Sequence, residues 1–401
     1  MLKAAYPERP DALTWVFLGL GLLLLPLGLY LALAAPPDVN QGYLVRIMYL
    51  HVPGAWLGYL AFLVTFLYSL LYLFRQDPRY DRVASASAEI GLVFMGLALV
   101  TGMLWARPTW GVYWTWEPRL TTTAILFAVY VGYFLLRGAI EDPELRRKAA
   151  AAVGILGFLN VPISYMSVKW WRSLHQTQSI DLTTGKIHIA PEMLQALLFN
   201  LLVFTLLYLG FVRFRGFLVA WRRERRRRDG GLRHLGLRPH LPHGLRVPGL
   251  PLLPLPEGQM RAKYVFGLVV VLGALAYLLF GGLGQNLVYF LTPSEYLQAE
   301  AKYAGRPVRL GGLVKPGTVR YDKDLLELRF VLTDGVAEVP VLHKGTPPGM
   351  FKEGQGVVVE GRFQEGVFRG TNLLVKHSET YQPPKAGWTP EDVRRLIEEA
   401  K

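Results

Sequence analysis

The sequence predicts a membrane protein with an all-α bundle of six transmembrane helices, a seventh anchor helix, and a small all-β barrel domain of the OB type. Three observations predict this fold class. Seven apolar stretches are long enough to cross a bilayer, 52% of the 401 residues are hydrophobic and only 18% charged, and the C-terminal quarter changes to short alternating runs. The chain is also too long for one ordinary domain, so we expect two folded parts.

The seven apolar stretches cover residues 14–34, 52–74, 88–105, 120–137, 149–168, 191–212 and 264–282. Each has about 17–23 residues, enough to cross a hydrocarbon core of roughly 30 Å at about 1.5 Å per residue. The small residues after the first stretch, Ala34-Ala35-Pro36, form a poor cleavage site. We therefore expect the first stretch to remain as an uncleaved span.

Lysine and arginine in the loops predict the orientation of the spans. The loops after the second, fourth and sixth spans are basic, and residues 213–228 alone contain eight arginines. Basic loops mark the cytoplasmic side, so the N-terminus and residues 213–263 are expected there. The net charge of +14 then indicates contact with anionic membrane lipid and no nucleic-acid partner. We expect a multi-pass membrane protein, with the remaining loops and everything beyond Gly284 on the outer face.

The chain divides into five predicted segments. Residues 1–215 form the six-span part, 216–259 a basic linker rich in proline and glycine, and 260–284 the anchor. Residues 292–382 form the outer barrel, and 383–401 a flexible C-terminal tail. The barrel is predicted from five alternating runs separated by turns, at 308–314, 325–332, 337–342, 357–363 and 367–375.

Tryptophan is concentrated in the outer loop between the third and fourth spans. Four of the ten tryptophans, Trp105, Trp110, Trp114 and Trp116, fall within twelve residues, and Arg119 follows them. An interfacial aromatic belt is one explanation. A flat platform for a large planar apolar ligand is the other, with Arg119 meeting an anionic group of that ligand. The residues alone leave both explanations open.

Two outer histidines lie at span boundaries, and two further candidates follow the barrel. Imidazole is a common axial ligand of haem iron, so His51 and His175 could hold one iron from opposite faces, or each could make only local hydrogen bonds. His188 is a third outer histidine without aromatic neighbours. His377 and Tyr381 offer a nucleophile and an iron ligand, although their spacing alone is a weak signal. The chain has no cysteine, which excludes a CxxCH attachment motif and thiolate sites.

These motifs together resemble two families of the system I cytochrome c maturation pathway. Residues 1–215 resemble the C component (CcmC), a six-span haem-handling protein, in MYLHVPGAW around His51, WGVYWTWEPRLTTT, and SVKWWRSLHQ around His175. Residues 260–384 resemble the E component (CcmE), a haem chaperone with one anchor and an OB-type outer domain. The matching segments there are MRAKYVFGLVVVLG, GGLVKPGTV and VKHSETYQPP.

The resemblance implies haem b as cofactor and assigns a role to each motif. His51 and His175 are the axial ligands of the first site, and Trp110, Trp114 and Trp116 form its platform. His377 is joined covalently to a haem vinyl group, and Tyr381 is an axial ligand there. The implied protein transfers and attaches haem rather than turning over as an enzyme. It gives haem to its tethered chaperone domain for delivery to apocytochrome c. Other implied partners are cytochrome c maturation membrane proteins, ABC-type haem transporter subunits and membrane lipid. The resemblance also implies the bacterial plasma (inner) membrane as the location, with the haem loops and the barrel on its periplasmic face.

Two other functions stay open at this point. One is a haem-transport permease that partners an ATPase, since the chain itself lacks the GxxxxGK phosphate loop. The other is a membrane redox cytochrome, which is disfavoured because the histidines lie outside the spans or at their boundaries. The sequence also departs from the resemblance in two respects. Glu117 stands where the first family usually has Asp, and the two components are usually separate proteins.

Overall fold

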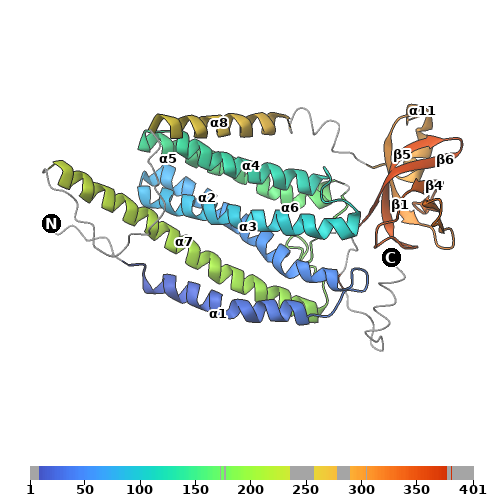
Figure 1. Ribbon diagram of the computed structural model, residues 1–401, viewed down its shortest axis with the longest axis horizontal. Helices are drawn as coiled ribbons and strands as arrows, with labels where there is room; N and C mark the ends of the chain where they lie inside the picture. The colour runs from blue at the N-terminus through green and yellow to red at the C-terminus, as the bar shows by residue number, and fades with distance from the viewer. Residues whose placement is uncertain are drawn as a thin grey trace.

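The computed structural model describes residues 9–171, 173–175, 178–234, 257–277, 290–303, 305–376 and 381. A helical bundle carries a β-barrel at one end (Figure 1). Among the described residues, six helical segments are long and apolar enough to cross a membrane, as predicted. The helices of the bundle are α1 (Ala12–Ala34), the 3-10 helix η1 (Tyr43–Ile47), α2 (Met48–Arg75), α3 (Pro78–Trp110), α4 (Pro118–Ala139), α5 (Pro143–Phe158), α6 (Asn160–Trp170), α7 (Pro191–His234) and α8 (Glu257–Ala276).

Three helices begin with the same local device, an acidic residue followed by proline. The side chains of Asp77, Glu117 and Asp142 accept hydrogen bonds from backbone N–H groups in the first turns of α3, α4 and α5. Such a cap satisfies a donor that has no partner within the helix, and proline fits the first helical position because its missing N–H is not needed there. Sequence therefore fixes where these three helices start.

Two predicted spans differ from the observed helices. The third was predicted to cover residues 88–105, but α3 runs from Pro78 to Trp110, so Trp105 and Trp110 lie on a helix and not in a loop. The fifth is divided into α5 and α6 at Leu159. Pro162 explains this break, because it has no N–H to donate to the carbonyl of Phe158 and its ring crowds that carbonyl.

The helices on either side of the predicted linker are longer than expected. α7 continues to His234, because Leu, Ala, Glu and Arg in this stretch favour helix. α8 starts at Glu257, and its apolar part, Ala262–Ala276, overlaps the predicted seventh span; residues 278–282 of that span lie outside the described residues.

α8 packs along α4, although it follows α7 in the chain (Figure 1). Glycines allow the close approach. A Cβ on Gly138 would lie 2.5 Å from the ring of Tyr264, and one on Gly267 would lie 3.1 Å from Leu135. Helices associate in membranes through such small residues, because two backbones can then come into contact. The anchor helix therefore has a defined position against the bundle.

Aromatic stacking and one buried ion pair join α2, α3 and α4. The rings of Phe62 and Tyr130 stack with centroids 3.7 Å apart. Arg137 donates to both carboxylate oxygens of Asp81, at 2.6 and 3.0 Å, and both side chains are largely buried. A bidentate contact of this kind compensates the cost of burying two charges among apolar helices.

The barrel has the strand order of an OB fold. Its strands are β1 (Val308–Val314), β2 (Arg320–Asp322), β3 (Glu327–Thr333), β4 (Glu338–Lys344), β5 (Gly356–Gln364) and β6 (Val367–Val375). The order β1-β5-β6-β4-β3 closes through a β1–β3 pairing, β4 and β6 run parallel, and the short β2 extends β3 at the edge. The five predicted strands are confirmed with ends shifted by two residues or fewer; β2 was not predicted.

Asp334, in the turn between β3 and β4, connects the short helix α10 (Pro293–Gln298) to the barrel through hydrogen bonds. Asp334 accepts hydrogen bonds from the backbone and hydroxyl of Ser294, at 2.9 and 2.5 Å, and from the backbone N–H groups of Val336 and Ala337. Burial raises the pKa of this carboxyl, but the hydrogen bonds lower it more, so the pKa is held well below its usual range. The ionised form is therefore the one that stabilises the fold.

We expect Asp334→Asn to destabilise the barrel by about 2 kcal/mol at pH 7, because the hydrogen bonds then go to a neutral acceptor. The folded pKa is lowered, so the wild-type stabilisation is complete above the unfolded pKa of about 3.9 and is lost as the pH falls through the folded value. The difference in melting temperature between the two proteins, measured by calorimetry, should therefore stay constant from pH 7 to about 5 and shrink as the pH falls below about 4. Glu338→Gln, an exposed acid at the start of β4, is the control and should change little. Equal melting temperatures at pH 7 would contradict this account of Asp334.

Apolar side chains join the barrel to the end of the bundle. Ala106, Trp110 and Leu174 from the bundle share a buried cluster with Val358 and Leu374 from the barrel. At the edge of this interface Lys352 donates to the side-chain oxygen of Asn40, at 2.5 Å. The barrel is thus held directly against the C-terminal end of α3.

Candidate functional site

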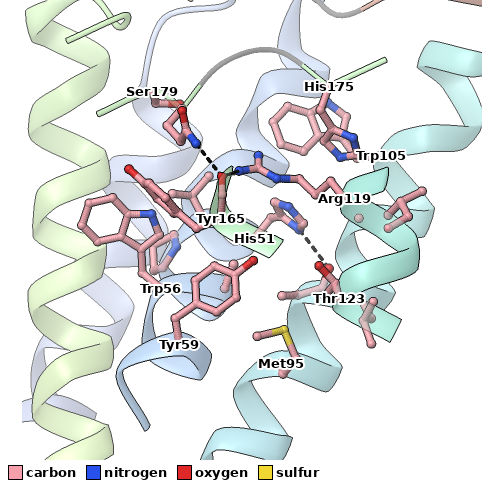
Figure 2. A pocket seen from close by; sticks show the side chains of 18 of the residues that line it. His51, Trp56, Tyr59, Met95, Trp105, Arg119, Thr123, Tyr165, His175 and Ser179 are labelled. Atoms are coloured by element: carbon pink, nitrogen blue, oxygen red, sulfur yellow. Dashed lines mark hydrogen bonds between the residues drawn. The ribbon is translucent and has the colours of Figure 1, made fainter. Parts of the chain in front are cut away.

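A cavity lies in the bundle, near the end that contacts the barrel. It encloses about 1260 Å³, part of it open to solvent, between α2, α3, α4, α6 and α7. Most of its lining is apolar or aromatic, with a few polar groups, which is typical of a site for a small organic molecule. The side chains on which the site depends are His51, Tyr59, Met95, Trp105, Trp110, Arg119, Tyr165, His175 and Gln178 (Figure 2).

His51 lies in the first turn of α2 and faces the cavity. Its Nδ1 is 2.9 Å from the carbonyl oxygen of Ala98 and 3.2 Å from the hydroxyl of Thr101. A carbonyl only accepts, so Nδ1 carries the proton and Nε2 has the free lone pair. Gly102 leaves room for the ring, because a Cβ there would lie 3.0 Å from Cε1, and Trp105 contacts the ring edge-on at 5.7 Å. Position, tautomer and orientation of the imidazole are thus all fixed.

His175 lines the same cavity from the loop after α6, and Glu117 holds it. The Nδ1 of His175 is 3.1 Å from Oε1 of Glu117, which also accepts a hydrogen bond from the backbone N–H of Leu120 at 2.6 Å. The hydroxyl of Ser173 donates to the other carboxylate oxygen. Burial raises the pKa of Glu117, but His175 and these hydrogen bonds lower it more, so its pKa lies below the usual value. An ionised carboxylate therefore keeps the proton of His175 on Nδ1.

Arg119 brings a positive charge into the cavity. In the view of Figure 2 its side chain lies between His51 and His175. One terminal nitrogen makes a long contact of 3.4 Å with the backbone oxygen of Tyr165, which also accepts from Gln178 at 2.7 Å. The Nε of Arg119 is buried without a hydrogen-bond partner among the described residues. A guanidinium in this state suits an anionic group on a bound molecule.

The predicted tryptophan platform is only partly in the cavity. Trp110 lines it and contacts the ring of His175 edge-on, with centroids 4.9 Å apart. Trp114 and Trp116 are not among the described lining residues; they pack edge-on against each other at 5.5 Å, and Trp116 is 39% exposed. The cavity thus brings together both predicted iron ligands, His51 and His175, with Trp110 and Arg119. The other two tryptophans of the predicted platform are not part of it.

The remaining predicted site residues belong to the barrel part. Tyr381 is 1% exposed and packs into the bundle next to the cavity, where its ring stacks on Trp105 with centroids 6.3 Å apart. Tyr381 is buried in one cluster with six residues of the bundle, which we call the tyrosine socket: Val45, Met48, Tyr49, Trp105, Ile189 and Met193. His377 lies outside the described residues.

Sequence reasoning missed two residues that organise the site. Glu117 positions His175. The only feature of the sequence that could have indicated this role is the presence of a carboxylate inside the tryptophan-rich motif. Trp105 was counted with the loop, but it lies on α3 and links the ring of His51 to Tyr381. Both roles depend on contacts between distant segments, which the local sequence does not reveal.

The fold and the site define a multi-pass membrane protein with a two-histidine cavity and an OB-type barrel docked beside it. Two family models match the chain, Heme exporter protein C over residues 5–229 and the CcmE domain over residues 287–384. The chain therefore belongs to the CcmC family in its helical part and to the CcmE family in its barrel part, joined in one polypeptide. This membership confirms the predicted resemblance and indicates involvement in cytochrome c biogenesis and haem handling.

Relatives of both parts are known under separate names. A cytochrome c-type biogenesis protein CcmE from Thermus thermophilus is 84% identical over 142 residues, which is 35% of this chain and 100% of that protein. A Heme exporter protein C from Bradyrhizobium diazoefficiens is 42% identical over 215 residues, 51% of this chain and 81% of that protein. Another, from Paracoccus denitrificans, is 34% identical over 202 residues, covering 50% and 81% respectively.

Proposed function

We propose that the cavity binds haem with its iron between His51 and His175. The observation that carries this proposal is that both imidazoles line one cavity and that the Nδ1 of each faces an acceptor, the carbonyl oxygen of Ala98 at 2.9 Å and the carboxylate of Glu117 at 3.1 Å. The Nε2 of each ring is then the nitrogen available to a metal, which is the usual arrangement of a ligating histidine with a second hydrogen-bonded partner.

The other cavity residues suit the rest of a haem molecule. The apolar and aromatic lining matches a porphyrin, with Trp110 next to one predicted iron ligand. Arg119 supplies the positive charge that a propionate requires. Trp114 and Trp116 stay predicted as the outer part of the platform, on the strength of the family resemblance alone.

We further propose that haem passes from this cavity to the barrel, where His377 bonds to a vinyl group and Tyr381 ligates the iron, for delivery to apocytochrome c. The family resemblance supports these two roles. The docking of the barrel beside the cavity supports a transfer within one chain. Other cytochrome c maturation membrane proteins, including ABC-type transporter subunits, are the proposed partners.

The proposed orientation follows from the basic loops. Arginines are concentrated at the ends of the spans opposite the cavity, as in residues 213–228 of α7. Such basic segments remain on the cytoplasmic side. The cavity mouth and the barrel then both face the outer, periplasmic side. This arrangement makes haem available where apocytochromes carrying CxxCH are matured.

Titration of the purified full-length chain with haemin tests the proposal. We expect saturable binding of one haem per cavity, with the low-spin absorption spectrum of iron ligated by two imidazoles. Haem supplied during membrane expression should in addition leave a fraction that survives denaturation, because it is bonded to the barrel. A five-coordinate spectrum, or no saturable binding, would contradict the two-histidine site.

Glu117→Gln should weaken haem binding by roughly 10–100-fold, as is usual when the hydrogen-bond partner of a ligating histidine is lost. Glutamine keeps the size of the side chain but removes the charge that fixes the proton of His175 on Nδ1. The dissociation constant for haemin measures the effect. Glu192→Gln, another acid in the first turn of a helix but exposed, is the matched control. If the two variants bind haemin equally well, Glu117 does not position a ligand.

A further inference from the structure

Tyr381 is held from two sides in the tyrosine socket. On one side its backbone pairs in parallel with Ile189; its N–H donates to the carbonyl of His188 at 3.1 Å, and its carbonyl accepts from the N–H of Ala190 at 3.0 Å. On the other side its ring stacks on Trp105. Main-chain pairing together with a buried ring is how an extended segment docks on a neighbouring strand.

The segment that pairs with Tyr381 is one arm of a hairpin whose other arm lines the cavity. Residues 178–190 form this hairpin, with Ile180 opposite Ile187 and the N–H of His188 donating to the carbonyl of Ser179 at 2.8 Å. Residues 178–180 line the cavity, and residues 188–190 contact Tyr381. A displacement of the first arm is therefore transmitted to the second through hydrogen-bonded backbone.

Trp105 provides a second connection between the cavity and Tyr381. Its indole contacts the ring of His51 edge-on at 5.7 Å and stacks on Tyr381, and its N–H donates to the side chain of Gln41 at 2.7 Å. The indole cannot rotate without breaking that hydrogen bond. One fixed ring thus lies between a predicted iron ligand of the cavity and a predicted iron ligand of the barrel.

Binding of a planar ligand between the two histidines disturbs the hairpin at its start. Gln178 and Arg119 both donate to the backbone oxygen of Tyr165, and Arg119 lies between the histidines in the view of Figure 2. A ligand that reaches both imidazoles would have to occupy this space and would therefore separate these contacts. Gln178 is the first residue of the hairpin, so the displacement begins at the arm that lines the cavity.

We propose that the tyrosine socket is the resting position of Tyr381, and that occupation of the cavity releases Tyr381 through the 178–190 hairpin and Trp105. In the socket the phenol is 1% exposed and is not among the residues that line the cavity, so it cannot reach a metal there. Tyr381 becomes available as a ligand only when haem is present to be received. This inference rests on the proposed function in one respect, the identity of the ligand.

Amide hydrogen exchange on the full-length chain tests the proposal. Without haemin, we expect the peptide that covers residues 186–192 to be protected. Tyr381→Ala should raise its exchange rate at least tenfold, and Tyr381→Phe should not. Tyr303→Ala, which removes a ring that stacks on Tyr296 within the barrel, is the matched control and should leave this peptide unchanged. In the wild type, haemin should raise the exchange rate as Tyr381→Ala does.

A cross-link shows that the barrel is still folded and docked in each variant. The chain has no cysteine, so Asn40→Cys and Lys352→Cys introduce a unique pair at positions whose native side chains touch. Unchanged yield with a short bis-maleimide excludes general unfolding as the cause of faster exchange.

The possible failures are distinguishable. If haemin produces the two-imidazole spectrum but residues 186–192 stay protected, release is wrong and the proposed function stands. If Tyr381→Ala leaves the peptide protected, the socket is not a docking site. If haemin gives no spectrum but Tyr381→Ala raises exchange, the proposed ligand is wrong and haem-driven release fails with it.

Discussion

His377→Ala is expected to abolish the haem stain that the full-length chain keeps on a denaturing gel. Haem held only by axial bonds dissociates when the protein unfolds, whereas a bond between imidazole and vinyl carbon survives. The chain has no cysteine, so a thioether cannot account for surviving stain. Peroxidase staining of membranes from cells supplied with haem, normalised to the amount of protein, measures the effect.

Tyr381→Phe is the matched control for His377→Ala. It removes the phenol oxygen that would ligate the iron and keeps the imidazole, so the stained band should persist while the absorption spectrum changes. Stain that survives in His377→Ala would show that another side chain holds the haem, and the receiving role of His377 would be wrong.

Loss of either cavity histidine should reduce haem loading of the barrel by at least about tenfold. With His51→Ala or His175→Ala the proposed haem site loses one of its two axial ligands, a larger loss than that of a hydrogen-bond partner to a ligand. The ratio of haem stain to protein at His377 reports the loading, and the spectrum of the purified chain reports the ligand lost.

His188→Ala is the control for both histidine variants. This histidine lies in the hairpin next to the cavity, and its contact with Tyr381 runs through the backbone, which alanine keeps. We expect normal loading. If His51→Ala and His175→Ala also load His377 fully, haem reaches the barrel without passing through the cavity.

The sequence was sufficient for the fold class because its patterns are local. Apolar length predicts the spans and alternation predicts the strands. The acid-proline pairs that begin α3, α4 and α5 are also local, but they were recognised only in the structure. The errors have local causes as well. Helix α3 continues beyond its apolar stretch to Trp110. Pro162 divides the fifth span, although that span is largely apolar along its whole length.

The site could be predicted only in part, because it is built from distant segments. His51, Trp110, Arg119 and His175 were recognised by residue type and motif, but nothing in the sequence places their side chains in one cavity. The carboxylate of Glu117 had no assigned contact until its distance to His175 was known. The burial of Tyr381 under Trp105 joins residues 276 positions apart in the chain, beyond any local pattern.

The packing of α8 on α4 bears on how such a chain could arise. Close contact at Gly138 and Gly267 orients the anchor helix by shape, and this contact needs no covalent connection to α7. In Thermus thermophilus the corresponding CcmE is a protein of its own. A fusion of the two parts is compatible with this contact, and it sets the stoichiometry: each helical bundle is synthesised with one barrel, and neither can be produced in excess of the other.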